Sequence, residues 1–281
     1  MSTPYPAGVE PFVREAGSGP GVVCLHANAS SSLQWRSLME ALAPRFHVLA
    51  PDAYDAGESP PWPSDRVIRL RDEVALIEPV LARTGAPLAL VGHSYGAATA
   101  LIAALEHPGR VCALALYEPT LFSIVDAEMP APNEADGIRK IVVDASRWLD
   151  AGEPDAAAER FIDYWMGTGA FQSMPEARKV RVAASVTKIR RWAFALFTEP
   201  ARLAAFRLLD IPVLYMLGRR STPAAFAVAR LLVAALPRVE LVQFEDLGHM
   251  GPVVDPEPVN VAVGRFLDRH LIPLEALSCS R

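Results

Sequence analysis

Short apolar runs alternate with stretches of helical spacing along most of the chain. This alternation is the pattern of a parallel sheet covered by helices. Strands are predicted at residues 21–25, 46–50, 88–91, 111–116, 212–217 and 239–244. Helices are predicted at residues 72–84, 97–106 and 223–236. The last helix is well marked, because Thr222 can cap it and Pro223 suits its first position. The fold class is therefore predicted to be α/β, with a mostly parallel sheet and helices on both faces.

Residues 120–209 interrupt this alternation, because they contain no convincing strand. Helical patterns there cover residues 135–149, 155–165 and 175–197, separated by Pro and Gly. An insertion at this place would lie over the carboxyl edge of the sheet, where open α/β sheets bind ligands. We therefore predict a helical cap, or lid, at 120–209 on a core made of 1–119 and 210–281. Ordinary crossover helices are the alternative, but the length of the insertion favours a cap.

Composition narrows the classes of partner. The chain has 281 residues, is 51% hydrophobic and carries a net charge of −5 at pH 7. This charge gives no general attraction to nucleic acid or anionic lipid, and the longest apolar runs are strand-sized. The first residues lack the pattern of a signal peptide. The three cysteines have neither disulfide-framework nor zinc spacing. We expect a cytoplasmic protein whose partner is a small-molecule substrate, with no nucleic-acid or membrane partner; the oligomeric state is not readable.

The strongest chemical signal is the G-x-S-x-G sequence of Gly92–Gly96, centred on Ser94. It directly follows a predicted buried strand and opens a helix of small residues. In such a strand–turn–helix the serine occupies a strained elbow, and its hydroxyl projects above the sheet. Ser94 is therefore predicted to be a catalytic nucleophile, in preference to an incidental serine in a Gly-rich turn.

A histidine stands in the loop after the last predicted strand, in Gly248-His249-Met250. A serine hydroxyl is a weak nucleophile unless an imidazole takes its proton. The position of His249, late in the chain and after the serine, fits the order of a Ser–acid–His triad. We predict His249 as the general base and interpret the other histidines as structural or surface residues.

The loop His26–Ser30 follows the first strong strand and is a candidate for part of an oxyanion hole. Acyl transfer needs two N–H donors directed at the developing oxyanion. One donor is predicted at the backbone of Tyr95, the residue after the nucleophile, and the other at Asn28. For the Asn28 side chain, a purely structural role in a polar turn is the alternative.

With these motifs, the Asp52–Ser59 segment and the inserted helices, the chain resembles the α/β-hydrolase family over nearly its whole length. The resemblance implies a sheet of about eight strands, a lid, no metal or cofactor, and a Ser–His–acid triad. The sequence departs from the family pattern in the first loop, which reads His-Ala-Asn instead of His-Gly-x. It also carries Asp55 and Ala56 where a glycine-rich turn is usual.

A third departure concerns the triad acid. The resemblance places it in a Gly-x-x-Asp turn after the strand at 212–217, but this turn reads Gly218-Arg219-Arg220-Ser221. Glu118, just past the strand at 111–116, is the candidate substitute. In this position of the acid the chain resembles certain haloalkane dehalogenases, which take theirs from the end of that strand. Their nucleophile is an aspartate, so Ser94 argues against dehalogenation. We predict Glu118 as the acid, with Asp246 as the alternative.

The predicted cap is rich in aromatic residues, of which Trp165 and Trp192 are the candidates for lining the substrate pocket. Arg190 and Arg191 are interpreted as part of a solvated helix face. The predicted function is hydrolysis of an ester or related acyl bond of a small apolar substrate through a Ser94 acyl-enzyme. Hydrolysis of a carbon–carbon bond and acyl transfer would use the same residues. A hydrolase-like protein that only binds a small molecule is a further alternative.

Overall fold

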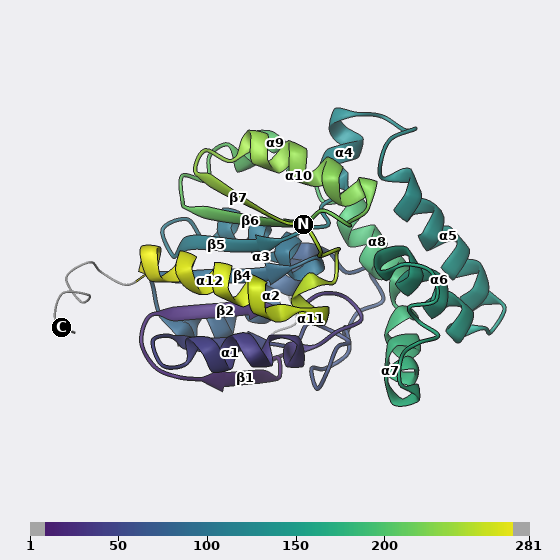
Figure 1. Cartoon of the computed structure of the whole chain (residues 1–281), viewed down its shortest axis with the longest axis horizontal. Helices are drawn as coiled ribbons and strands as arrows, with labels where there is room; N and C mark the ends of the chain where they lie inside the picture. Colours follow the sequence, from purple (N-terminus) through teal and green to yellow (C-terminus); the bar gives the residue numbers. More distant parts are fainter. Residues whose placement is uncertain (1–8, 272–281) are drawn as a thin grey trace.

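The computed structural model describes residues 9–271 and has at its centre a twisted seven-stranded sheet (Figure 1). The strand order is β1-β3-β2-β4-β5-β6-β7, and only β1 runs antiparallel to its neighbour, β3. The strands are β1 Val13–Ala16, β2 Gly21–Leu25, β3 His47–Pro51, β4 Leu88–His93, β5 Val111–Tyr117, β6 Val213–Gly218 and β7 Val239–Phe244. All six predicted strands are present. The resemblance implied about eight strands, but the described residues form seven.

Helices cover both faces of the sheet, as predicted. Alternate residues of β2 and β4 point to opposite faces, so that Val23 and Leu90 pack with one set of helices, Val22 and Val91 with the other. The first set is α2 Leu70–Thr84, α3 Tyr95–Glu106 and α10 Pro223–Ala235. The second set is α1 Arg36–Leu42, which follows the 3-10 turn η1 Ser32–Trp35, and α12 Pro256–Leu271, which follows α11 Gly251–Val254. The central strands are buried on both sides by these two layers.

Six helices occupy the long connection between β5 and β6, which contains no strand. They are α4 Ser123–Glu128, α5 Asp136–Asp150, α6 Pro154–Met166, α7 Glu176–Val186, α8 Ile189–Phe197 and α9 Leu203–Phe206. Figure 1 shows α5 to α8 beside the sheet, beyond the ends of its strands, whereas α4 and α9 lie close to α10 and pack against it. Arg191 of α8 contacts the core through an ion pair with Asp55 at 3.1 Å.

The prediction of one helix over residues 175–197 is wrong, because the chain turns at Thr187 and Lys188 and forms two helices, α7 and α8. No Gly or Pro marks this turn in the sequence. The two helices pack against different partners, α7 against α6, and α8 against α3, α4 and α5. Tertiary packing therefore redirects a segment whose helical spacing continues without interruption.

Candidate active site

The elbow at Ser94 lies where β4 leaves the sheet. Ser94 has φ 57° and ψ −115°, a strained backbone conformation for a residue with a side chain. The glycines on either side permit this turn, because a Cβ on Gly96 would lie 2.2 Å from the carbonyl oxygen of Leu25, and one on Gly92 would lie 2.5 Å from Cα of Ala97. Strand, turn and helix therefore approach more closely than larger residues would permit.

The register of the sheet brings Ser94 and Glu118 to the same edge. His93 is paired with Tyr117 in the parallel β4–β5 ladder, so Ser94 and Glu118 each follow a paired residue by one position. The backbone N–H of Ser94 donates to the carbonyl of Tyr117 at 2.9 Å. Glu118 also has a positive φ, 44°, which directs the chain away from the sheet at this point.

His249 lies between the other two side chains. Its Nε2 is 2.9 Å from Ser94 Oγ, and its Nδ1 is 2.7 Å from Glu118 Oε2. All three side chains are buried. With the proton on Nδ1, the imidazole donates to the carboxylate and accepts from the serine hydroxyl. The structure thus brings together the three residues that the sequence predicted as a triad.

The turn after β6, from which the expected aspartate is missing, supplies hydrogen-bond donors to Glu118 instead. The backbone N–H of Gly218 donates to Oε1 at 2.8 Å, and the hydroxyl of Ser221 donates to Oε2 at 2.6 Å. With the His249 N–H, three donors satisfy a carboxylate that is 0% exposed. The contact of Ser221 is not predicted from the sequence, although its place in the usual acid turn was a signal.

Asp246, the alternative acid, is far more exposed. Its side chain is 83% exposed and forms an ion pair with Arg220. No hydrogen bond or ion pair joins it to His249, whereas Glu118 contacts the ring directly. The geometry therefore favours Glu118.

The His249 loop is anchored through its backbone. The hydroxyl of Tyr117 donates to the carbonyl of Gly248, and Nε2 of His93 donates to the carbonyl of His249, both at 2.7 Å. Nδ1 of His93 accepts from Gln34 Nε2 at 3.0 Å, and Gln34 Oε1 accepts from the backbone N–H of Ala27 at 3.2 Å. This chain of bonds links the loop after β2 to the His249 loop.

Burial holds the pKa of His93 well below its usual value, so that the ring is neutral and has one donor and one acceptor nitrogen. The sequence indicates only a structural or surface role for His93 and gives no sign of its contact with the His249 loop. Its two hydrogen-bond partners, Gln34 and His249, lie 59 and 156 residues away in the sequence, so no local pattern could have indicated them.

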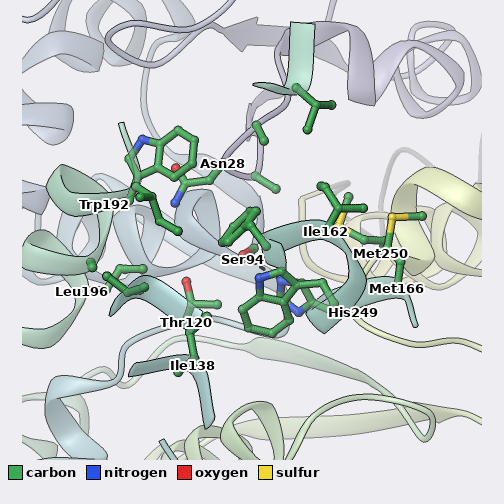
Figure 2. Close-up of a pocket in the computed structure, with 18 of the residues that line it drawn as sticks. Asn28, Ser94, Thr120, Ile138, Ile162, Met166, Trp192, Leu196, His249 and Met250 are labelled. Atoms are coloured by element: carbon green, nitrogen blue, oxygen red, sulfur yellow. Dashed lines mark hydrogen bonds between the residues drawn. The ribbon is translucent and has the colours of Figure 1, made fainter. Parts of the chain in front are cut away.

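The two predicted oxyanion donors lie at the same end of the site. Tyr95 is the first residue of α3, so its backbone N–H has no acceptor within the helix. Asn28 lines the cavity that contains Ser94 and His249. Figure 2 shows Asn28, Ser94 and His249 around this cavity. The role of these two residues as donors to an oxyanion stays a prediction.

Below Tyr95 lies a buried carboxyl group that the sequence did not single out. Glu73 of α2 accepts from the Tyr95 hydroxyl at 3.3 Å and from the backbone N–H of Tyr54 at 3.2 Å. Burial raises the pKa of Glu73 to about 8. The protonated side chain thus holds Tyr95 in place from behind the elbow.

Glu73 is expected to make stability pH-dependent. Between its reference pKa of 4.5 and about 8, the folded state keeps a proton that the unfolded state loses. The free energy of unfolding should then fall as the pH rises, by about 1.4 kcal/mol per unit, and level off above pH 8. Glu73→Gln should remove this fall in the free energy of unfolding, as measured by urea titrations from pH 5 to 9. The exposed Glu153→Gln should leave it unchanged, and equal slopes for wild type and Glu73→Gln would contradict the assignment.

Ser94 and His249 open into a largely apolar cavity between the sheet edge and α5–α8. The lining includes Phe161, Trp165, Trp192 and Leu196 from the inserted helices, and Figure 2 shows Trp192 and Leu196 on its wall. Both tryptophans predicted for the pocket therefore line it. A concave, mostly apolar lining with a few polar groups is typical of a site for a small organic molecule.

Trp165 has a second contact that the sequence did not indicate. Its ring stacks on that of His249, with centroids 3.9 Å apart and planes inclined by 27°. A tryptophan face attracts a cation, so it stabilises the imidazolium form of the ring beneath it. Trp165 connects α6 directly to His249.

No group of three or more His, Cys, Asp or Glu side chains within residues 9–271 is placed to hold a metal ion. Over the same residues, no helix combines the length and apolar character needed to cross a membrane.

Comparison with known proteins agrees with this geometry. The model of the family described as the alpha/beta hydrolase fold matches residues 20–256. The chain belongs to the alpha/beta hydrolase fold family. The family match spans the elbow, Glu118, the inserted helices and the His249 loop, which confirms the predicted fold.

Relatives of this alpha/beta hydrolase include enzymes with different substrates. Lipase LipV of Mycobacterium tuberculosis is 27% identical over 271 residues, covering 89% of this chain and 94% of the lipase. The 2-(acetamidomethylene)succinate hydrolase of Mesorhizobium japonicum is 26% identical over 260 residues, covering 91% of both. A thermophilic esterase from Thermogutta terrifontis has a similar structure, with a TM-score of 0.72, 22% identity and coverage of 93% and 94%. The lipase and the succinate hydrolase support a hydrolytic enzyme, and the esterase structure supports the fold.

Proposed function

We propose that this alpha/beta hydrolase cleaves an ester or related acyl bond of a small apolar substrate through a Ser94 acyl-enzyme. The observation that carries the proposal is the continuous series of contacts Ser94–His249–Glu118, with hydrogen bonds of 2.9 and 2.7 Å, at the floor of an apolar cavity. A hydroxyl bonded to a buried, carboxylate-oriented imidazole is suited to nucleophilic attack on an acyl carbon.

In the first half of the proposed reaction, Ser94 Oγ attacks the acyl carbon as its proton passes to His249 Nε2. The resulting imidazolium donates through Nδ1 to Glu118, and the face of Trp165 adds further stabilisation. The backbone N–H of Tyr95 and a donor from Asn28 bind the oxyanion. His249 then returns the proton to the leaving oxygen as the alcohol departs.

In the second half, water replaces the alcohol. His249 Nε2 takes a proton from water, the hydroxide oxygen bonds to the acyl carbon, and Ser94 Oγ leaves and regains its proton. The residues 120–209 act as a lid that selects the acyl group. The same residues would serve carbon–carbon bond hydrolysis or acyl transfer, and the apolar lining favours neither over an ester.

A panel of p-nitrophenyl esters of increasing acyl length, with lactones and diketones beside them, tests the reaction class. We expect turnover of esters with a burst of p-nitrophenol when deacylation is slow. Turnover of diketones without esters would reassign the enzyme to carbon–carbon hydrolysis. Binding without any turnover would favour a protein that only binds small molecules.

Two tryptophans of the cavity should have separable effects, because only Trp165 touches His249. Trp192→Ala should change the relative kcat/KM of long and short acyl esters and leave p-nitrophenyl acetate nearly unaffected. Trp165→Leu should slow all esters, acetate included, by roughly 2- to 30-fold through loss of the stacked face, and Trp165→Phe should recover part of the rate. Equal, uniform losses for Trp192→Ala and Trp165→Leu would show that both residues only hold the lid helices together.

A further inference from the structure

The wall that α7 contributes to the cavity carries a single arginine. Arg178 and Val182 are four residues apart on this helix and both line the cavity. The cavity lining contains no Asp or Glu, and apart from His249 its only ionisable side chain is Arg178. Arg178 thus brings a permanent positive charge to the lining of a largely apolar cavity that contains Ser94.

Arg178 lacks a carboxylate partner among residues 9–271. Three other arginines of the inserted helices form ion pairs with carboxylates. Arg160 pairs with Asp144, Arg190 with Asp150, and Arg191 with Asp55. The Arg190-Arg191 pair, the most conspicuous basic feature of this segment, therefore serves contacts within the protein. Other arginines of the inserted helices, such as Arg147 and Arg181, also form no ion pair among residues 9–271, but Arg178 is the one that lines the cavity.

Thr120 provides a second polar group in the cavity lining. Its Oγ1 is buried and has no hydrogen-bond partner among the described residues. Figure 2 shows this hydroxyl in the cavity wall below Ser94. A buried hydroxyl without a partner is costly, and a ligand with polar atoms would satisfy it. The cavity is therefore equipped for a substrate that is not purely hydrocarbon.

We propose that the substrate is an ester whose apolar acyl group carries a second, ionised carboxylate, and that Arg178 binds this carboxylate. The inference rests on the proposed esterase function and names the substrate class of that site. Guanidinium and carboxylate match in a planar, two-bond geometry, which is strong where water is partly excluded. The methylene groups of the acyl chain contact the apolar wall, and the carboxylate replaces the missing partner of Arg178.

Matched esters test the proposal. p-Nitrophenyl monoesters of aliphatic dicarboxylic acids with four to ten carbons are compared with p-nitrophenyl alkanoates of the same chain length. We expect one chain length at which wild type prefers the carboxylated ester. Arg178→Met should lower kcat/KM for that ester about 10- to 100-fold and leave the neutral ester unchanged. Arg178→Lys should retain part of the preference. The exposed Arg181→Met, on the same helix but outside the cavity lining, is the control.

Binding to the Ser94→Ala protein gives a readout that needs no turnover. Calorimetry should show tighter binding of monomethyl suberate than of neutral dimethyl suberate, and the difference should disappear when Arg178→Met is added. Turnover of neutral esters without a preference that depends on Arg178 would overturn the inference and leave the proposed function intact. Absence of all ester turnover, with Arg178-dependent binding of the anion, would overturn the proposed function and leave the carboxylate site.

Discussion

A fluorophosphonate probe should label the wild-type protein on Ser94, and Ser94→Ala should abolish both labelling and ester turnover. Ser94 Oγ is the hydroxyl that His249 Nε2 contacts at 2.9 Å, so removal of the oxygen removes the nucleophile and leaves the imidazole without its proton donor. In a related triad, loss of the serine costs about 10⁶-fold in kcat. Gel-based labelling and mass spectrometry of the labelled peptide measure the first result, and p-nitrophenyl ester hydrolysis measures the second.

Ser123 is a suitable control for this experiment. Its hydroxyl is also buried, and it forms no hydrogen bond to another described residue. Ser123→Ala should therefore keep the labelling and nearly all of the activity. A label on another serine, or full labelling of Ser94→Ala, would remove Ser94 from the proposed mechanism.

Glu118→Gln should lower kcat by about 10⁴-fold with little change in folding. An amide at this position can donate to Nδ1 of His249, which would favour the tautomer with its proton on Nε2 and leave no lone pair for the Ser94 proton. It would also remove the negative charge that stabilises the imidazolium. The magnitude is taken from the equivalent change in a related triad. Steady-state kinetics measure kcat, and circular dichroism with thermal unfolding checks the fold.

Asp246→Asn is the matched control, because it makes the same chemical change in the other candidate carboxylate. Asp246 is exposed and paired with Arg220, so kcat should stay within about 2-fold of wild type for a surface ion pair. The opposite pattern would transfer the acid to Asp246. If neither variant lost activity, Ser94 and His249 would act as a dyad.

Ser221→Ala would extend the same experiment to the usual acid turn. Its hydroxyl donates to the Glu118 oxygen that also accepts from His249. Loss of this donor should reduce kcat far less than Glu118→Gln, because Gly218 still holds the other carboxylate oxygen. In this protein the turn after β6 donates hydrogen bonds to the carboxylate of Glu118, at the end of the neighbouring strand.

Strands β2 to β6 could be predicted because runs of apolar residues indicate burial on both faces of a sheet, a property of each segment on its own. The weakly apolar β1 was missed for the same reason, since Val13–Ala16 is short, partly exposed and defined by its pairing with β3. The split between α7 and α8 was missed because it depends on the helices against which each half packs. Patterns along the chain carry no information about such partners.

By itself, the sequence determined the α/β architecture, the elbow at Ser94, the histidine loop and the two candidate carboxylates, because each depends on residues adjacent in the chain. Tertiary structure decided the rest. The β4–β5 register places Glu118 beside the ring of His249. Asp246 instead lies on the surface, paired with Arg220. Packing of the inserted helices stacks Trp165 on His249 and brings Arg178 into the lining of the cavity. Glu118 and His249, for example, are 131 residues apart in the sequence. Whether two such distant residues meet depends on the fold of the whole chain and not on the residues next to either of them.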